Sequence, residues 1–309
     1  MKLNEENLPF LLIARIELGK IMKQDRISKV INEVQKLPTL PSVANKVTKL
    51  LKDPTCTAIR VSEVIDKDPS LTIRVLRLVN SAFYSIRAEV TNVRHAVALL
   101  GFKTITQMVI TISVFDVFKG GYGREFDREG FWKHSIGCAV ISQKIAQLTD
   151  YAGVDDCFTA GLLHDIGKVV VDQYLHEEME KVIKLTQEHE ISFADAEKEI
   201  MGINHADIGG QVMENWKIPI PIIVAVKYHH NVLEERGNGK NARDPIVDIV
   251  RLSDVICKRE KIGYTGDSIM PEITEDLYSR LNINKEAIDK VIESGRDEIE
   301  KAGIFIELT

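Results

Sequence analysis

The 309-residue chain has few cysteines, only a small excess of acidic charge and no long hydrophobic run. Its four cysteines (Cys56, Cys138, Cys157 and Cys257) are scattered without a Cys-x-x-Cys spacing, which excludes a cysteine zinc knuckle and fits reduced thiols. The net charge of −6 provides no basic surface for non-specific nucleic-acid binding. No apolar run approaches the roughly 20 residues of a membrane span, and the first residues do not resemble a signal peptide. We therefore expect a soluble, cytoplasmic protein that binds neither nucleic acid nor membrane.

Regular alternation of apolar and polar residues, the pattern of strands, is nearly absent, whereas apolar residues recur at helical spacing. In the first part of the chain this spacing predicts helices at about 43–51, 61–65, 71–79, 93–100 and 104–118. It predicts further helices at about 128–148, 155–174, 176–201, 205–216, 220–231 and 245–260, and two charged amphipathic helices within 272–301. We therefore predict an all-α fold.

The best linker signal is the glycine-dense stretch Gly120-Gly121-Tyr122-Gly123, which is followed by charged residues. We place a boundary between two helical lobes there. The predicted organisation is an N-terminal extension at 1–26, a first lobe at 27–120, a second lobe at 121–261 and a helical tail at 262–309.

Two strongly polar residues, His164 and Asp165, interrupt an apolar run that extends from Leu162 to Val171. Burying an ionised carboxylate costs several kcal/mol unless the group is paired, hydrogen-bonded or bound to a metal. Either the pair lies on the outside of its helix, or a positive charge in the interior requires it there.

More histidines fall on helix faces whose other residues are apolar and should be buried. His134 belongs to an apolar stripe spaced by threes and fours, and the doublet His229-His230 continues the apolar face of the helix at 220–231. His205 opens its helix directly after Asn204, a favourable N-cap residue. A single inward histidine is more often a hydrogen-bonded core residue than a ligand, but several on separate helices are hard to attribute to chance.

The last candidate is Asp254, four residues after Val250 on the inward side of the helix at 245–260, whereas Asp248 and Arg251 are predicted to face elsewhere. Imidazoles and carboxylates directed inward from successive helices are how helical bundles build metal sites. The predicted metal ligands are His134, His164, Asp165, His205, His229, His230 and Asp254.

Seven ligands exceed the three protein groups of a typical catalytic zinc site, so one or two divalent transition metals are predicted, with Asp165 as a bridging ligand. Imidazole and carboxylate favour iron or manganese here, with nickel or zinc as alternatives, and no cysteine is expected near the ligands. Asp165 and Lys168 are the predicted catalytic residues. Lys168 either holds a substrate phosphate or forms a surface salt bridge.

The other three histidines, His95, His176 and His189, have charged neighbours in the sequence. We predict that they lie on the surface and take no part in the site.

In chain order, His134, His164-Asp165 and Asp254 resemble the ligand pattern of the HD superfamily of metal-dependent phosphohydrolases. The additional His205 and the doublet His229-His230 resemble the HD-GYP branch of that superfamily. The Gly-Tyr-Pro stretch that gives this branch its name is absent after the doublet, so cyclic di-GMP is not the expected substrate.

Several motifs follow one another in the first lobe. They are Leu37-Pro-Thr-Leu-Pro41, Asp53-Pro54, Val64-Ile-Asp-Lys-Asp-Pro-Ser-Leu71, Arg77-Leu-Val-Asn-Ser-Ala-Phe83 and Ala96-Val-Ala-Leu-Leu-Gly101. Together they resemble the HDOD domain, the HD-related output domain of bacterial signalling proteins, from about residue 27 to about residue 235. The resemblance implies an all-α fold and a role in signal transduction.

Two functions remain open. The first is a signal-transduction output protein whose dinuclear HD-type site hydrolyses a phosphate ester or a nucleotide. The second is a non-catalytic module that binds an unidentified signalling protein, in which the metal is structural or vestigial. The intact ligand set favours the first function, whereas the HDOD resemblance and the missing Gly-Tyr-Pro stretch favour the second.

Overall fold

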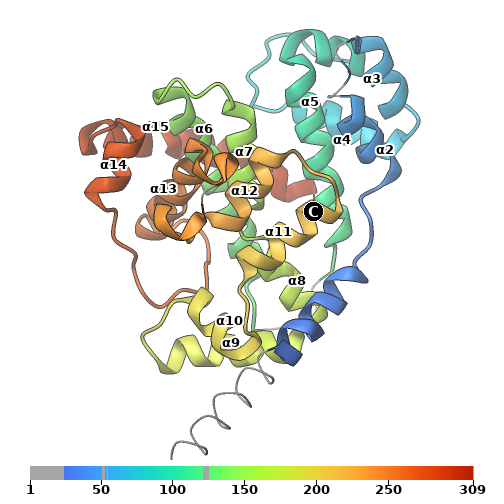
Figure 1. The fold of residues 1–309 in the computed structure, drawn as a ribbon. Coiled ribbons are helices and arrows are strands. Elements are labelled where there is room, and N and C mark those ends of the chain that lie inside the picture. Colours follow the sequence, from blue (N-terminus) through green and yellow to red (C-terminus); the bar gives the residue numbers. More distant parts are fainter. Residues whose placement is uncertain (1–23, 51–52, 54, 121–124, 238, 309) are drawn as a thin grey trace, which may run out of the picture.

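The computed structural model describes residues 24–50, 53, 55–120, 125–237 and 239–308. Within these ranges the chain forms helices and no strand, which confirms the all-α prediction (Figure 1). Most of the predicted N-terminal extension, and Gly121 to Gly123 of the predicted boundary, lie outside the described residues. The division into lobes therefore stays a prediction.

From residue 42 to residue 117 the chain forms a group of helices at the upper right of Figure 1, whereas the helical segment at 24–35 lies near the bottom, where Lys29 pairs with Glu178. Local signals set their starts: Thr57, Asp68 and Asn92 each cap a helix by accepting a hydrogen bond from a backbone amide of the first turn. The helices are α2 (Ser42–Leu50), α3 (Ala58–Ile65), α4 (Pro69–Val79) and α5 (Val93–Val117).

Helix α5 is the central element of this group and runs down into the rest of the molecule (Figure 1). It is broken at Gly101, whose φ of 83° and ψ of 163° are not helical, as the glycine between two predicted helices suggested. By length and composition alone, α5 is the one helix in the described ranges that is apolar enough to cross a membrane. Sixty-one per cent of its most apolar window is buried inside the protein, as expected for a core helix.

The second part of the chain forms a bundle around α6 and α7, and the 18-residue helix α15 near its end packs on α6. Its elements are α6 (Arg128–Leu148), α7 (Val154–Leu163), α8 (Ile166–Tyr174), α9 (His176–Glu188), α10 (Phe193–Met201), α11 (His205–Asn215), α12 (Ile220–Tyr228), η2 (Leu233–Arg236), η3 (Lys240–Arg243), α13 (Pro245–Arg259), α14 (Glu275–Leu281), α15 (Lys285–Ala302) and η4 (Gly303–Leu308). Two predicted helices, 155–174 and 176–201, are each broken into two.

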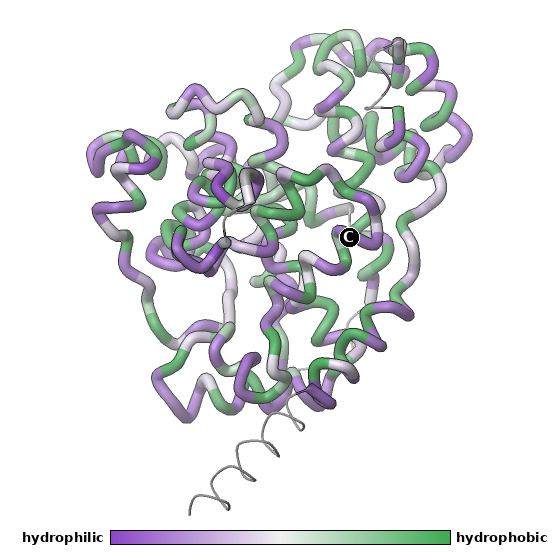
Figure 2. Tube along the Cα trace, in the orientation of Figure 1, coloured by the Kyte–Doolittle hydropathy of each residue, from purple (hydrophilic) through white to green (hydrophobic). Residues whose placement is uncertain are grey.

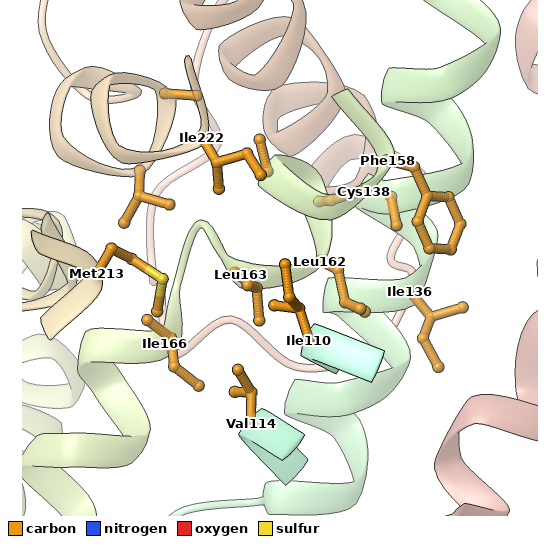
Figure 3. Close-up of a cluster of buried hydrophobic side chains, with 14 of the residues drawn as sticks. Ile110, Val114, Ile136, Cys138, Phe158, Leu162, Leu163, Ile166, Met213 and Ile222 are labelled. Carbon is orange, nitrogen blue, oxygen red and sulfur yellow. The ribbon is translucent and has the colours of Figure 1, made fainter. Parts of the chain in front are cut away.

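One continuous hydrophobic core joins the two parts, and hydrophilic residues are concentrated on outer helices such as α9 and α14 (Figure 2). Where α5 meets α7, the side chains of Ile110, Val114 and Leu162 lie in the same buried cluster (Figure 3). The carboxyl-terminal segment adds to this junction, because the Phe305 ring packs on those of Phe83 and Phe158. The bundle that carries the candidate ligands is thus held on a shared apolar core.

Candidate metal centre

His164 and Asp165 lie between two helices, not within one. The predicted continuous helix at 155–174 is wrong, because α7 ends at Leu163 and α8 begins at Ile166. The apolar residues on either side of the pair, Leu163 and Ile166, point into the core (Figure 3). The polar pair therefore occupies a buried turn, where His164 is fully buried and Asp165 is 1% exposed.

Gly167 explains why this turn can approach α11. A β-carbon at this position would collide with the backbone carbonyl of His205. The absent side chain lets α8 and α11 pack closely, and His205 Nε2 then lies 2.9 Å from Asp165 Oδ1. As predicted, α11 begins at His205 after an Asn204 cap, and the Asp207 side chain completes a capping box.

One group of side chains, which we call the first cluster, lies where α6, the end of α7 and α13 meet. His134 Nε2 is 3.1 Å from Asp254 Oδ1, and His164 Nε2 is 3.7 Å from the same oxygen. The thiol of Cys138 belongs to the same group, with its Sγ 3.4 Å from His134 Nε2. One ligand atom from each of these four residues lies within 4.8 Å of all the others, and all four residues are buried.

The second cluster contains Asp165, His205, His229 and His230, whose ligand atoms also lie within 4.8 Å of one another. His229 Nε2 is 3.5 Å from Asp165 Oδ1, and His230 Nε2 is 2.7 Å from His205 Nε2. The two clusters are adjacent, because Asp165 Oδ2 is 3.4 Å from His164 Nε2. All seven residues predicted from the sequence thus meet in one region, with Asp165 at the junction; their role as ligands stays a prediction.

Four of these histidines are held by an outer hydrogen bond through Nδ1. The acceptors are the carbonyls of Ile262, Gly161 and Val226, at 3.2, 2.7 and 2.7 Å from His134, His164 and His229, and the Glu197 carboxylate, at 2.5 Å from His205. Because Nδ1 donates its proton outward, Nε2 presents a lone pair to the cluster. This arrangement is typical of metal-bound histidines.

Those lone pairs face further acceptors. The buried atoms His164 Nε2, Asp165 Oδ1 and His229 Nε2 have no hydrogen-bond partner. Opposed lone pairs in a buried site repel each other unless a positive charge lies between them, so the donor set fits a divalent cation. The histidine and aspartate clusters are thus the part of the chain suited to divalent metal binding.

The pKa values of the histidines shift in opposite directions within this region. Burial by itself would lower the pKa of His134, but Cys138 and Asp254 raise it to about 9. In the second cluster, burial is the main reason why the pKa of His229 falls to about 4. Without a cation the first cluster thus attracts a proton, whereas His229 stays neutral, the state in which imidazole binds metals.

Two lysines pair with the aspartates of the clusters. The fully buried Lys168 ammonium lies 2.7 Å from Asp165 Oδ2 and donates to the Thr265 carbonyl at 2.8 Å, so it forms no surface salt bridge. Lys258 lies 2.8 Å from Asp254 Oδ2 and 2.9 Å from Asp267. Burial would raise the pKa of Asp165, but His164 and Lys168 lower it well below its usual value.

A cavity of about 160 Å³ opens beside the second cluster. It is lined in part by the doublet His229-His230, by Asp254 and by the cations Arg251 and Lys258. Lys168 is not among its lining residues. A small anion in this cavity would therefore meet cationic side chains next to the histidines.

Sequence reasoning missed several residues of this region. Cys138 was detectable, since it follows His134 by one helical turn, but Glu197 carries no local signal and is brought to His205 only by the packing of α10. The expectation that no cysteine lies near the ligands is wrong. Asp248, expected to face elsewhere, is only 5% exposed and pairs with Arg236.

The other three histidines lie outside the clusters. His95 and His189 are exposed, as predicted, and His176 is half-buried with its Nε2 3.1 Å from Glu180.

The helical fold and the two clusters define the class of protein: an all-α protein with an HD-like set of histidine and aspartate side chains. The family model of the HDOD domain matches residues 37–232 of the sequence. The chain therefore belongs to the HDOD domain family. An HDOD domain protein of unknown function from Geobacter sulfurreducens is 27% identical, with a TM-score of 0.78 over 93% of this chain and 98% of that one.

Two further relatives are more distant. An uncharacterised protein of Treponema pallidum is 23% identical over 84% of this chain but only 48% of its own length, so the chain spans about half of that relative. A Shewanella amazonensis protein, provisionally named a metal-dependent phosphohydrolase, is 19% identical with a TM-score of 0.61 over 91% of this chain and 99% of that one. At that identity the likeness shows the fold alone.

Proposed function

We propose that this chain is a metal-dependent phosphohydrolase of bacterial signal transduction, acting in the cytoplasm on a phosphate ester or a nucleotide. The observation that carries the proposal is the junction at Asp165, which joins two adjacent ligand clusters beside a cavity whose lining includes Arg251 and Lys258 together with Asp254 and Asp267. The provisional phosphohydrolase name of the Shewanella protein, and that of a Marinobacter aquaeolei protein as a signal transduction protein, support the same reading.

When bound, two divalent cations supply an activated water and neutralise the charge of the phosphoryl oxygens. The residues of the chain then position the reactants. Lys168 holds one oxygen of Asp165, so that the other oxygen stays directed at His205 and His229. Arg251 supplies positive charge to the cavity that would receive the phosphate, whereas the Lys258 ammonium is paired with Asp254 and Asp267.

Hydrolysis of cyclic dinucleotides, nucleotides and generic phosphate esters by protein loaded with Mn²⁺ or Fe²⁺ tests the proposal. We expect slow turnover that is lost when His229 and His230 are both replaced by alanine. Arg251→Gln should raise KM about tenfold, because one charged hydrogen bond to the substrate is lost. Metal content is measured in parallel, since Arg251 Nη1 also donates to the His230 carbonyl at 3.2 Å. Arg259→Gln, at an exposed position of the same helix, is the matched control. Metal-loaded protein that is inactive on the whole panel would contradict the proposal.

A non-catalytic signalling module is the second candidate, and the lysines favour it. Lys168 and Lys258 each neutralise one oxygen of a cluster aspartate, which reduces the negative charge available to cations. In that case the metal would be structural or vestigial, and the chain would act through a protein partner. Full metal occupancy without turnover, together with a partner that binds only the metal-loaded form, would support this function.

A further inference from the structure

Cys138 is the one member of the first cluster that is neither histidine nor aspartate. It lies one helical turn after His134 on α6 and is fully buried, so its side chain approaches the cluster from the same helix. Gly161 lets α7 approach this point, because a β-carbon there would lie 2.6 Å from the Cys138 carbonyl oxygen. The same close approach brings His164, at the end of α7, to the cluster.

The separations of the ligand atoms fit a tetrahedral ion. Bonds of about 2.0–2.3 Å at tetrahedral angles place neighbouring ligand atoms roughly 3.3–3.6 Å apart. The three measured separations are 3.1 Å from His134 Nε2 to Asp254 Oδ1, 3.7 Å from His164 Nε2 to that oxygen, and 3.4 Å from Cys138 Sγ to His134 Nε2. Small shifts would therefore complete a four-ligand shell.

We propose that the Cys138 thiolate is the fourth ligand of the first cluster, which makes this cluster a His₂-Cys-Asp site for a cation that accepts sulfur, such as Zn²⁺ or Fe²⁺. The proposal rests on the metal binding in the proposed function but not on hydrolysis. A thiolate and a carboxylate together balance the charge of a divalent ion. Thiolate ligation also disfavours Mn²⁺, which prefers oxygen ligands.

The alternative is that Cys138 only fills space in the core, as buried cysteines often do. Cys157 shows what that role looks like here: it is fully buried and belongs to no group of potential ligands in the described residues. Cys138 differs from Cys157 because an unpartnered histidine nitrogen, His164 Nε2, is buried in the same cluster.

Cobalt substitution tests the proposal directly. Apoprotein loaded with Co²⁺ should show a near-ultraviolet thiolate-to-cobalt charge-transfer band in the wild type and in the matched control Cys157→Ala. Cys138→Ala should lose this band. Its affinity for one of the two metal equivalents should also fall at least about tenfold, since loss of an outer-shell partner alone costs that much.

X-ray absorption of the Zn²⁺-loaded wild type gives a readout that needs no variant, so it remains decisive if Cys138→Ala does not fold. We expect a sulfur neighbour at about 2.3 Å in addition to nitrogen and oxygen at about 2.0–2.1 Å. A shell of nitrogen and oxygen alone, or a charge-transfer band that persists in Cys138→Ala, would overturn the proposal. Sulfur ligation without phosphate hydrolysis would support the Cys138 proposal and contradict only the proposed hydrolytic function. Failure to bind any metal would overturn both the Cys138 proposal and the hydrolytic function.

Discussion

The two clusters differ in how they are built and in what they face. The first takes His134, Cys138 and Asp254 from the interiors of long helices and lies in the core, with Asp254 alone of its members lining the cavity. The second takes its residues from helix ends and a buried turn, and its doublet His229-His230 borders the cavity. Side chains on helix interiors are fixed by the packing of the whole helix, whereas those at helix ends depend on the segments that follow. The first cluster is thus suited to permanent ion binding and the second to exchange with a ligand.

Replacing the residue that joins the clusters should have the largest effect. Asp165→Asn removes the carboxylate that contacts His164 on one side and His205 on the other, so we expect metal content to fall in both clusters. Asp172→Asn is the matched control, because Asp172 is also 1% exposed and pairs with Arg128 at 2.6 Å, away from the ligands.

Elemental analysis of both purified variants, together with thermal unfolding, checks this prediction. Both variants should be destabilised, since Asp165→Asn removes the charged partner of the buried Lys168 and Asp172→Asn that of the half-buried Arg128. Only Asp165→Asn should lose metal. If only one of the two metal equivalents disappears in Asp165→Asn, the two clusters bind their metals independently and Asp165 does not bridge them.

The ion pairs of Asp248, which hold the segment after the second cluster in place, should be the next most sensitive feature. Asp248 accepts hydrogen bonds from Arg236 at 2.6 Å and from Arg280 at 2.8 Å, and this network ties the segment after His229-His230 to α13 and α14. Asp248→Asn should lower the free energy of unfolding by about 3 kcal/mol at neutral pH, the scale for a broken buried ion pair. The second cluster should lose metal affinity before the first.

The stability that Asp248→Asn loses should depend on pH in a defined direction. Burial would raise the pKa of Asp248, but hydrogen bonds from Arg280 and Arg236 lower it below its usual value. A lowered pKa in the folded state stabilises the protein above the unfolded-state pKa of about 3.9, and this stabilisation is lost as the pH falls through the folded-state pKa. The difference between wild type and Asp248→Asn should therefore shrink below about pH 4.

Denaturant unfolding at several pH values measures this difference. Asp116→Asn serves as the control, because the Asp116–Arg74 pair is more exposed and should contribute only about 1 kcal/mol or less. A difference for Asp248→Asn that stays constant from neutral to acidic pH would contradict the assignment.

A smaller effect is expected from the outer partner of His205. Glu197→Gln keeps the shape of the side chain but removes the charge that holds His205 Nδ1 at 2.5 Å. We expect metal affinity to fall about 10–100-fold in the second cluster and to stay unchanged in the first. Calorimetric titration of the metal should show this split, and Glu199→Gln, exposed on the same helix, should leave both affinities unaltered.

The sequence predicted much of this arrangement because helical periodicity is local. Residues such as His134 and Asp254 share a face with apolar neighbours, so their burial follows from spacing alone. The break between His164 and Asp165 could not be predicted in this way. The apolar run continues across it, and the close approach of Gly167 to the His205 carbonyl depends on a segment far away in the sequence.

Contacts between distant segments account for the other errors. Glu197 reaches His205, and Asp248 reaches Arg280, through tertiary packing that no local pattern encodes. Asp248 was expected outside the core because helical spacing places it on a different face from Val247, Val250 and Asp254. Its burial depends on two arginines from other elements, and neither lies close to it in the sequence.

The smallest effect is expected at a group with the composition of a metal site but not its surroundings. Glu125, His176 and Glu180 also bring three potential ligand atoms within 4.8 Å, yet both glutamates are exposed, whereas the ligands of the two clusters are buried or nearly so. Water competes there for any cation, and an exposed pair such as His176–Glu180 contributes little. His176→Ala should leave metal content unchanged and alter the free energy of unfolding by no more than about 0.5 kcal/mol. Loss of a metal equivalent in this variant would show that burial is not what separates a binding cluster from a chance grouping of the same residues.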